Sequence, residues 1–430
     1  MDLASCSLSL PSLKKVVERL LLSLALFLPH HGTITVFLPE PFRFWKEVVL
    51  LALFFTVLFY EIKNWRVYGW PTFSWAEILA VLFLLWTLSL VLISSDKSTS
   101  LVAARYLGLG FFVFLVISRL KRKFLNSDWE FWKQQFTSLF IVSCAASVLF
   151  GVWAKFMGGF EKLTGFYSPT ISSWVPGQTL PLYHETGEFI RMQGASSGPN
   201  EFAHLLLAAL FLIPFLPKGA NKRQEVCIKI LFIIILLFGI MQSFSRSAIL
   251  VAILGIIFFL TKQFKFNRQK IMSTLLVILL IFWGVLVGSK RLNNNFVQRL
   301  GTSEHFTRPV ESVKMGLQNP LVGNLGKLGP AARAKNLREN NDDKALIAEN
   351  IFADYFAQLG VFGLLLALGF FVVLFLELPY LNRLFLGAVF LTGSVATIFE
   401  MTPISIIFFL LFAFFSSMST MSPCKQKLPL

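Results

Sequence analysis

Four charged residues have side chains suited to chemistry at a phosphate-linked group: Arg191, Arg246, Arg308 and Glu349. An arginine guanidinium is permanently charged, and its forked N–H donors match the oxygens of a phosphate or a carboxylate. A carboxylate that is desolvated can act as a general base. Because these residues are far apart in the sequence, a shared site depends on the elements that carry them.

Arg246 is the only charged residue in the apolar segment 230–261, and a serine stands on either side of it. A charge that faces lipid at the centre of a spanning helix costs about 2.5–3.5 kcal/mol on insertion scales. We therefore predict two short membrane helices, 226–243 and 246–262, with Arg246 at the tip of the hairpin.

Arg191 lies a few residues before Pro199, which suits the first turn of a helix, with Ser197 or Gly198 as its cap. The start of such a helix presents free N–H groups and can bind an anion. An ordinary capped helix preceded by an arginine at the membrane surface explains the pattern equally well.

Arg308 precedes a segment with apolar residues on one helical face, which predicts a short amphipathic helix over 309–318. Asn319 and Pro320 end it. Glu349 opens the next apolar span. A general base is one interpretation of this glutamate, and an acid placed at a helix start by the helix dipole is the simpler one.

The composition indicates a polytopic membrane protein. The chain has 430 residues, of which 55% are hydrophobic and 14% charged, with mean hydropathy +0.68. Its net charge of +16 is distributed among short loops, which fits membrane topology better than nucleic-acid binding. The four scattered cysteines and the histidines show no spacing typical of metal ligands, and we expect neither metal nor cofactor.

Apolar segments of spanning length predict an all-α fold with about twelve transmembrane helices in one membrane domain, 1–430. The expected spans are 17–38, 44–62, 75–94, 100–118, 135–157, 199–217, 226–243, 246–262, 271–288, 350–378, 380–399 and 402–420.

Lysine and arginine predominate in alternate loops, which predicts cytoplasmic termini. Two long segments, 158–198 and 289–349, then face outward, and the second contains ten basic residues. This second segment lies between the ninth and tenth spans. It is either a solvated loop with no role in binding, or a helical, positively charged cap over an anionic ligand.

Four segments, in this order, resemble the O-antigen ligase and O-antigen polymerase superfamily of bacterial envelope proteins. They are Arg191 through Gly194 to Pro199-Asn200; Ser245-Arg246-Ser247-Ala248; Arg308 through Asn319-Pro320-Leu321 to Gly323; and Glu349-Asn350 through Leu359-Gly360 to Gly363.

The resemblance implies a fold similar to GT-C-like integral membrane glycosyltransferases, in the bacterial inner membrane, with the active site facing the periplasm. It implies inverting, metal-independent transfer of a glycan from undecaprenyl pyrophosphate to an acceptor hydroxyl on a glycan or lipid, as in lipopolysaccharide biosynthesis. Arg191, Arg246 and Arg308 would bind the pyrophosphate and offset the charge that develops as it leaves. Arg105 is a further candidate for this role.

The chain departs from the family pattern at one position. Ligases that it resembles have a histidine, taken as the base, where this sequence has Glu349. The change favours a polymerase, or a ligase for another glycan, over transfer to lipid A-core. His184 and His305, in the two outer segments, are alternative bases.

Two other functions stay open at this stage. A transporter or flippase for an anionic solute or a lipid-linked sugar would also span the membrane many times, with charges and broken helices near the bilayer midplane. A scaffold in an envelope-polysaccharide complex would need no arginine cluster.

Overall fold

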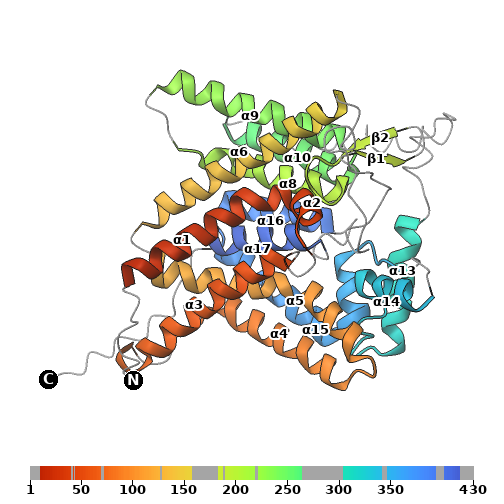
Figure 1. Ribbon diagram of the computed structural model, residues 1–430. Helices are drawn as coiled ribbons and strands as arrows, with labels where there is room; N and C mark the ends of the chain where they lie inside the picture. The colour runs from red at the N-terminus through yellow and green to blue at the C-terminus, as the bar shows by residue number, and fades with distance from the viewer. Residues whose placement is uncertain are drawn as a thin grey trace.

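The computed structural model describes residues 10–39, 42, 44–68, 72–125, 128–156, 183–186, 189–217, 221–263, 304–340, 346–393 and 401–416. These residues form a mainly helical protein with one two-stranded antiparallel sheet (Figure 1). The α-helices are α1 (Leu10–Phe27), α2 (His31–Phe37), α3 (Trp45–Tyr68), α4 (Trp75–Ile93), α5 (Lys97–Leu120), α6 (Trp129–Phe156), α8 (Pro199–Leu212), α9 (Lys222–Gln242), α10 (Arg246–Gln263), α13 (Glu304–Gln318), α14 (Gly329–Asn340), α15 (Ile351–Glu377), α16 (Tyr380–Gly393) and α17 (Thr402–Phe415). Short helical turns η2 (Leu28–His30), η4 (Lys121–Leu125) and η5 (Ile213–Phe215) extend α1, α5 and α8, and the strands are β1 (Tyr183–Thr186) and β2 (Phe189–Met192).

Among the described residues, five helices are long and apolar enough to cross a membrane: Trp75–Ile93, Lys97–Phe124, Trp129–Trp153, Lys222–Gln242 and Ile351–Glu377. Three shorter apolar helices are Pro199–Phe215, Arg246–Gly255 and Thr402–Phe415. The chain is therefore a multi-pass membrane protein. These helices support several membrane spans, whereas the expected count of about twelve stays a prediction. The expected span 271–288 lies outside the described residues, and each of the others overlaps a helix.

At the centre of the core α17 packs against α5, in the middle of the helices in Figure 1. Every residue of α17 is buried. Gly110 of α5 lets the ring of Phe409 approach so closely that a Cβ at this glycine would lie 2.5 Å from it. Phe409 in turn stacks on Phe370 of α15 at 5.8 Å. A glycine opposite a large ring gives the tight packing on which helix association in membranes depends.

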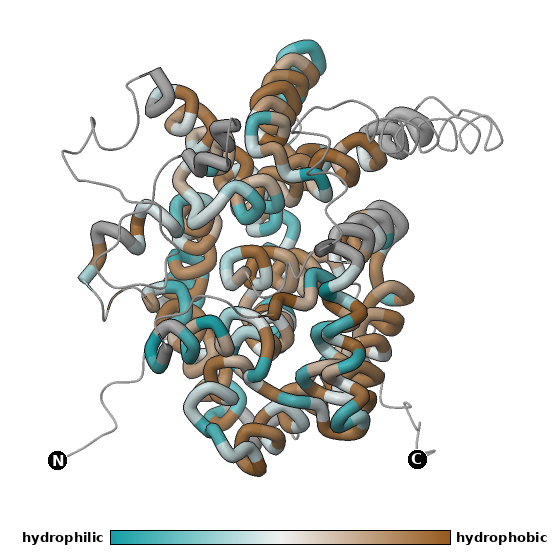
Figure 2. Tube along the Cα trace, turned by 90° about the vertical axis from the view of Figure 1, so that its right-hand side faces the viewer, coloured by the Kyte–Doolittle hydropathy of each residue, from teal (hydrophilic) through white to brown (hydrophobic). Residues whose placement is uncertain are grey.

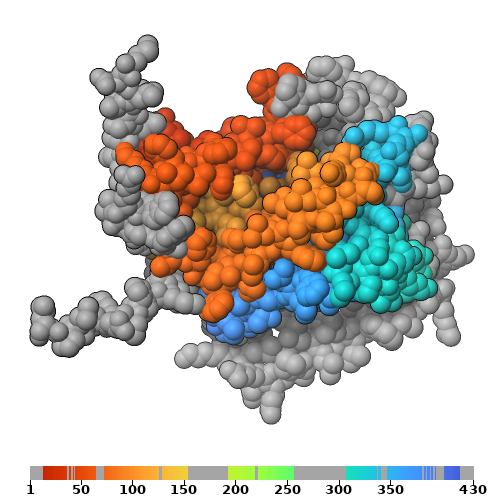
Figure 3. Space-filling view, turned by 90° about the horizontal axis from the view of Figure 1, so that it is seen from below, coloured from red at the N-terminus to blue at the C-terminus, as the bar shows by residue number. Residues whose placement is uncertain are grey.

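Elements from both predicted outer segments lie at one end of the helices. In Figure 1, α13, α14 and the β1–β2 hairpin all lie on the right. Figure 2 looks onto this end, where hydrophilic residues occur among the mainly apolar helices, and Figure 3 shows α13 beside α15. The helix predicted over 309–318 lies within α13, and α14 follows it after a non-helical stretch. In the first outer segment, β1 and β2 pair with His184 opposite Arg191.

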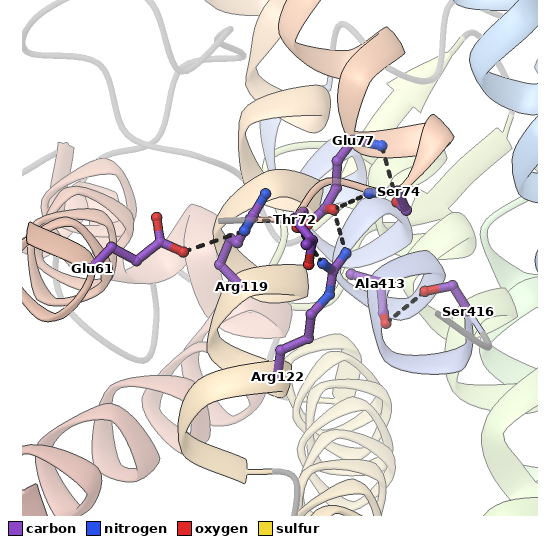
Figure 4. Close-up of polar contacts among 8 residues, drawn as sticks. All are labelled: Glu61, Thr72, Ser74, Glu77, Arg119, Arg122, Ala413 and Ser416. Atoms are coloured by element: carbon purple, nitrogen blue, oxygen red, sulfur yellow. Dashed lines mark hydrogen bonds and ion pairs between the residues drawn. The ribbon is translucent and has the colours of Figure 1, made fainter. Parts of the chain in front are cut away.

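At the opposite end of α4 and α5, Glu77 binds two arginines in a buried cluster (Figure 4). Its side chain is 0% exposed, lies 3.1 Å from Arg119 Nε and pairs with the guanidinium of Arg122. Arg119 also lies 3.3 Å from Glu61 and 3.8 Å from the Phe73 ring centroid. Arg119 and Arg122, from the end of α5 and the turn η4 that follows it, thus hold the α4–α5 pair together.

We expect Glu77→Ala to lower the free energy of unfolding by about 3–5 kcal/mol, because both arginines would lose a buried partner. The measurement is denaturant unfolding of the full-length protein in detergent. Glu61→Ala is the control: Glu61 is 20% exposed, and Arg119 keeps Glu77 in that variant. Equal losses in the two variants would contradict a central role for Glu77.

Candidate functional site

Arg308 and Glu349 form an ion pair between the guanidinium Nη1 and the carboxylate Oε1. Their side chains are 32% and 16% exposed, so the pair is partly buried but still open on one side. Arg308 lies in α13, and Glu349 comes two residues before α15. The structure thus joins a predicted phosphate ligand to the predicted base, a contact that the sequence did not foretell.

A break in α15 at Gly360 holds these two residues in place. In a regular helix the Val361 N–H would bond to the Ala357 carbonyl, four residues earlier. Here Val361 N donates to Pro320 O at 2.8 Å, and Ala357 O accepts from Asn324 N at 2.8 Å. One segment of chain therefore satisfies both halves of the missing helical bond. In a membrane protein such backbone groups must find partners inside the protein.

Glycine is required at the break for two reasons. Gly360 has φ +68°, and a Cβ there would lie 2.2 Å from Leu321 O. Gly323 has φ +71°, and a Cβ there would lie 2.6 Å from Gln358 O. Only glycine avoids both the left-handed strain and the collision. The Asn-Pro-Leu-x-Gly motif that follows α13 and the Leu-Gly motif inside α15 thus attach α13 to α15.

The two helices predicted on either side of the turn are confirmed: α9 ends at Gln242 and α10 begins at Arg246. Ser243 Oγ accepts from Ser245 N at 3.1 Å, and Phe244 has φ +51°. The Ser245 carbonyl then accepts the first helical bond, from Ile249 N at 2.9 Å. The serines thus make the turn, and Arg246 is half-buried at the start of α10.

The Arg246 motif touches the first motif through His204, whose role the sequence did not reveal. His204 Nδ1 lies 2.6 Å from Asn200 O, and its Nε2 lies 3.4 Å from Ser247 Oγ. Because a carbonyl can only accept, Nδ1 must bear the proton, and Nε2 accepts from the serine hydroxyl. The ring is fully buried in α8, so it fixes the start of α10 against α8.

The backbone of Arg191 lies in β2, and α9 contacts this strand, so the Arg191 motif lies beside the hairpin that carries Arg246. The Arg191 side chain, His184 and His305 lie outside the side chains that the structure describes. After the strand, Ala195 O accepts from Thr33 N at 3.0 Å, and Gly32 approaches the Ser196 backbone closely.

A carboxylate of the protein itself lies near the anion site expected at the start of α8. Gly198 is the residue before the helix, and Pro199 is its first residue, as predicted. Glu201, however, is 7% exposed and its Oε1 accepts from Ser197 N at 3.1 Å. A carboxylate at this position satisfies the helix start. Ser197 precedes the helix, so the binding of an external anion by the N–H groups of the first turn stays a prediction.

Arg105 belongs to a charged cluster formed by α2, α3 and α5. Its guanidinium pairs with Glu47, and Lys46 Nζ lies 3.7 Å from the same carboxylate oxygen. Lys46 Nζ also lies 3.1 Å from His31 Nε2. Lys46, Glu47 and His31 were not selected from the sequence, because they stand alone at the edges of apolar segments.

A polar contact attaches α14 to the turn between α4 and α5. Lys335 Nζ lies 2.6 Å from Asp96 Oδ2, and Asp96 also caps α5 by accepting from Thr99 N at 3.1 Å. The hydrogen bonds from Lys335 and then from Thr99 hold the pKa of Asp96 well below its ordinary value. The same contact raises the pKa of Lys335. The helix α14 is thus joined to α5, just as α13 is joined to α15.

The four motifs therefore form two joined pairs. The first and second meet through His204, and the third and fourth through the Arg308–Glu349 ion pair and the break at Gly360. Within the described ranges, no group of three or more histidine, cysteine, aspartate or glutamate side chains is placed to hold a metal ion. The chemistry available is electrostatic binding by arginine together with proton transfer by a carboxylate.

Residues 231–368 match the family model described as O-antigen ligase. This confirms the superfamily resemblance drawn from the motifs. The matched segment contains Arg246, Arg308 and Glu349, as well as the break at Gly360, but neither Arg191 nor Arg105. No curated protein matches the chain.

We expect Gly360→Ala to loosen α13 from α15, because the new methyl group would both strain the backbone and collide with Leu321 O. Strain of this kind costs about 1–3 kcal/mol. Limited proteolysis and thermal melting of the purified protein would measure the loss. Gly369→Ala is the control in the same helix, since its Cβ would lie an ordinary 3.7 Å from the nearest atom. Identical behaviour of the two variants would rule out the proposed attachment.

Proposed function

We propose that this member of the O-antigen ligase and polymerase superfamily transfers a glycan from undecaprenyl pyrophosphate to an acceptor hydroxyl at the outer face of the inner membrane. The family supports glycan ligation or polymerisation in the cell envelope. The observation that carries the specific proposal is the Arg308–Glu349 ion pair, which joins a cation and a carboxylate from separate motifs.

In the proposed reaction the donor pyrophosphate competes with Glu349 for Arg308. Once the guanidinium binds phosphate oxygens, the Glu349 carboxylate is released and can accept the proton of the acceptor hydroxyl. The hydroxyl oxygen attacks the anomeric carbon, and the bond from that carbon to the pyrophosphate oxygen breaks. The pyrophosphate leaves with the electron pair, and the configuration of the anomeric carbon inverts.

Arginines supply the positive charge in this scheme. Negative charge grows on the pyrophosphate as the bond breaks, and fixed cations that face it lower the barrier. Arg246 is suited to this because the turn made by its neighbouring serines fixes the backbone from which it projects. Arg191 is the third proposed ligand, from the strand that contacts α9. No metal ion is part of the proposal.

One observation favours the second candidate function, a transporter or flippase. The break at Gly360 interrupts a candidate membrane span, and Asp354 and Gln358 are buried in the same helix, joined at 2.8 Å. Broken helices with polar groups are typical of transport sites. Against this, the Gly360 break is filled by the protein's own backbone.

We expect the wild-type protein, purified and incubated with undecaprenyl-pyrophosphate-linked glycan, to give a ladder if it polymerises, or a shifted acceptor if it ligates. Arg246→Ala should abolish either product with normal expression, because the leaving pyrophosphate loses a fixed cation. Arg223→Ala, at the exposed far end of α9, should retain it. Uptake of the donor into vesicles without any transfer product would instead identify a transporter.

We expect Glu349→Gln to lower the rate constant of transfer by about 10²–10⁴-fold at neutral pH, the usual contribution of general acid–base catalysis. Glutamine keeps an oxygen for Arg308 but cannot take the proton. Single-turnover kinetics with saturating donor would measure the loss. Glu311→Gln is the matched control, an exposed glutamate in the same helix as Arg308. A wild-type rate for Glu349→Gln would remove this residue from the role of base.

A further inference from the structure

We propose that the cluster of α2, α3 and α5 that contains Arg105 binds an uncharged sugar unit of the glycan, rather than its pyrophosphate. The choice of a glycan as ligand rests on the proposed function. The cluster consists of His31, Phe44, Trp45, Lys46, Glu47 and Arg105, and we call it the α3 cluster.

The α3 cluster lies toward the end of the molecule that carries α13 and α14. Asp96, which caps α5, binds Lys335 of α14, and Arg105 lies nine residues further along α5. That spacing is about 14 Å along the helix. The first turn of α3 supplies Lys46 and Glu47, and α3 borders a hollow in the surface opposite α4 (Figure 3).

Charges in and around the α3 cluster balance. Arg105 and Lys46 both contact Glu47, and Lys46 also interacts electrostatically with Glu201. Two cations thus face two carboxylates. An additional anion such as pyrophosphate would meet no surplus of positive charge here, and it would be repelled by both carboxylates.

His31 adds no charge to this balance. Thr35 Oγ donates to the His31 carbonyl at 2.7 Å, and the same hydroxyl oxygen lies 3.2 Å from His31 Nδ1. With its proton used, the hydroxyl must accept from Nδ1–H. His31 Nε2 is then the acceptor for the Lys46 ammonium, which can only donate. The imidazole is neutral.

The donors and acceptors of the α3 cluster that have no partner within the protein match a ligand that carries hydroxyl groups. In the described part of the chain, the buried atoms Arg105 Nε, Trp45 Nε1 and Glu47 Oε2 have no hydrogen-bond partner. Two are donors and one is an acceptor. Buried polar groups are normally paired, so these three call for a ligand with both kinds of group. A sugar hydroxyl both donates and accepts, whereas a fully ionised phosphate only accepts.

An exposed aromatic ring completes the pattern. Phe44 is 51% exposed, and the guanidinium carbon of Arg105 lies 5.2 Å from its ring centroid. The Arg105 and Glu47 side chains are 28% and 15% exposed, so a ligand at the surface contacts them directly, and the three unpartnered atoms lie just beneath. The C–H face of a pyranose can stack on such a ring while its hydroxyls reach the polar atoms behind it.

The test uses the full-length protein in lipid nanodiscs and two probes, measured by calorimetry. One is the phosphate-free glycan released by mild acid from the lipid carrier of the host cell, and the other is inorganic pyrophosphate. Phe44→Ala and Trp45→Phe should each weaken glycan binding at least tenfold and leave pyrophosphate binding within twofold of wild type. Phe55→Ala, on the same helix and 59% exposed, is the control and should change neither.

Two results would overturn the proposal: no saturable binding of the glycan to the wild-type protein at millimolar concentration, or glycan binding that both variants leave unchanged. A drop in pyrophosphate binding in these variants would assign the cluster to the anion and contradict it equally. Loss of the proposed transferase activity is a separate outcome, because the glycan-binding measurement needs no turnover. A protein that binds the glycan in this pattern but transfers nothing would disprove only the proposed function.

Discussion

The structure depends on the requirement that a helix broken inside a membrane protein must find new partners for its freed backbone groups. At Gly360 the two groups of a single helical bond are separated, and residues 320–324 bind both of them. The same segment follows α13 directly, so satisfying the backbone also fixes α13 against α15. Arg308 lies in α13 and Glu349 lies just before α15, so they meet because these hydrogen bonds hold α13 against α15.

In two clusters of the described helices, positive charges are balanced by neighbouring carboxylates. At one end of α4 and α5, Glu77 neutralises Arg119 and Arg122. Near the other end, Glu47 lies between Lys46 and Arg105. Buried charge is expensive unless it is paired, so a chain with net charge +16 still needs these internal carboxylates. The basic character of the sequence therefore says little about where an anion can bind.

The sequence predicted the elements better than the contacts. A single charge in an apolar segment located the Arg246 hairpin, because lipid excludes an unpaired charge from the middle of a span. The amphipathic pattern after Arg308 located α13 in the same way. The Arg308–Glu349 pair, the His204 bridge and the α3 cluster join residues that are 41, 43 and 58 positions apart. Such contacts follow from helix packing, on which local periodicity carries no information.

Internal charge balance constrains how the proposed site can work. Arg308 cannot bind a diphosphate with full strength while Glu349 neutralises it, so the ligand must displace a carboxylate that is already in place. The free energy of that displacement reduces donor affinity, but it leaves an ionised base beside the bound phosphate. In this proposal, arginine would hold the base in the absence of donor, and the base would then be kept from an acceptor hydroxyl or water. The ion pair would thus couple donor binding to base release, and a histidine, neutral at this position, would not be held by arginine in the same way.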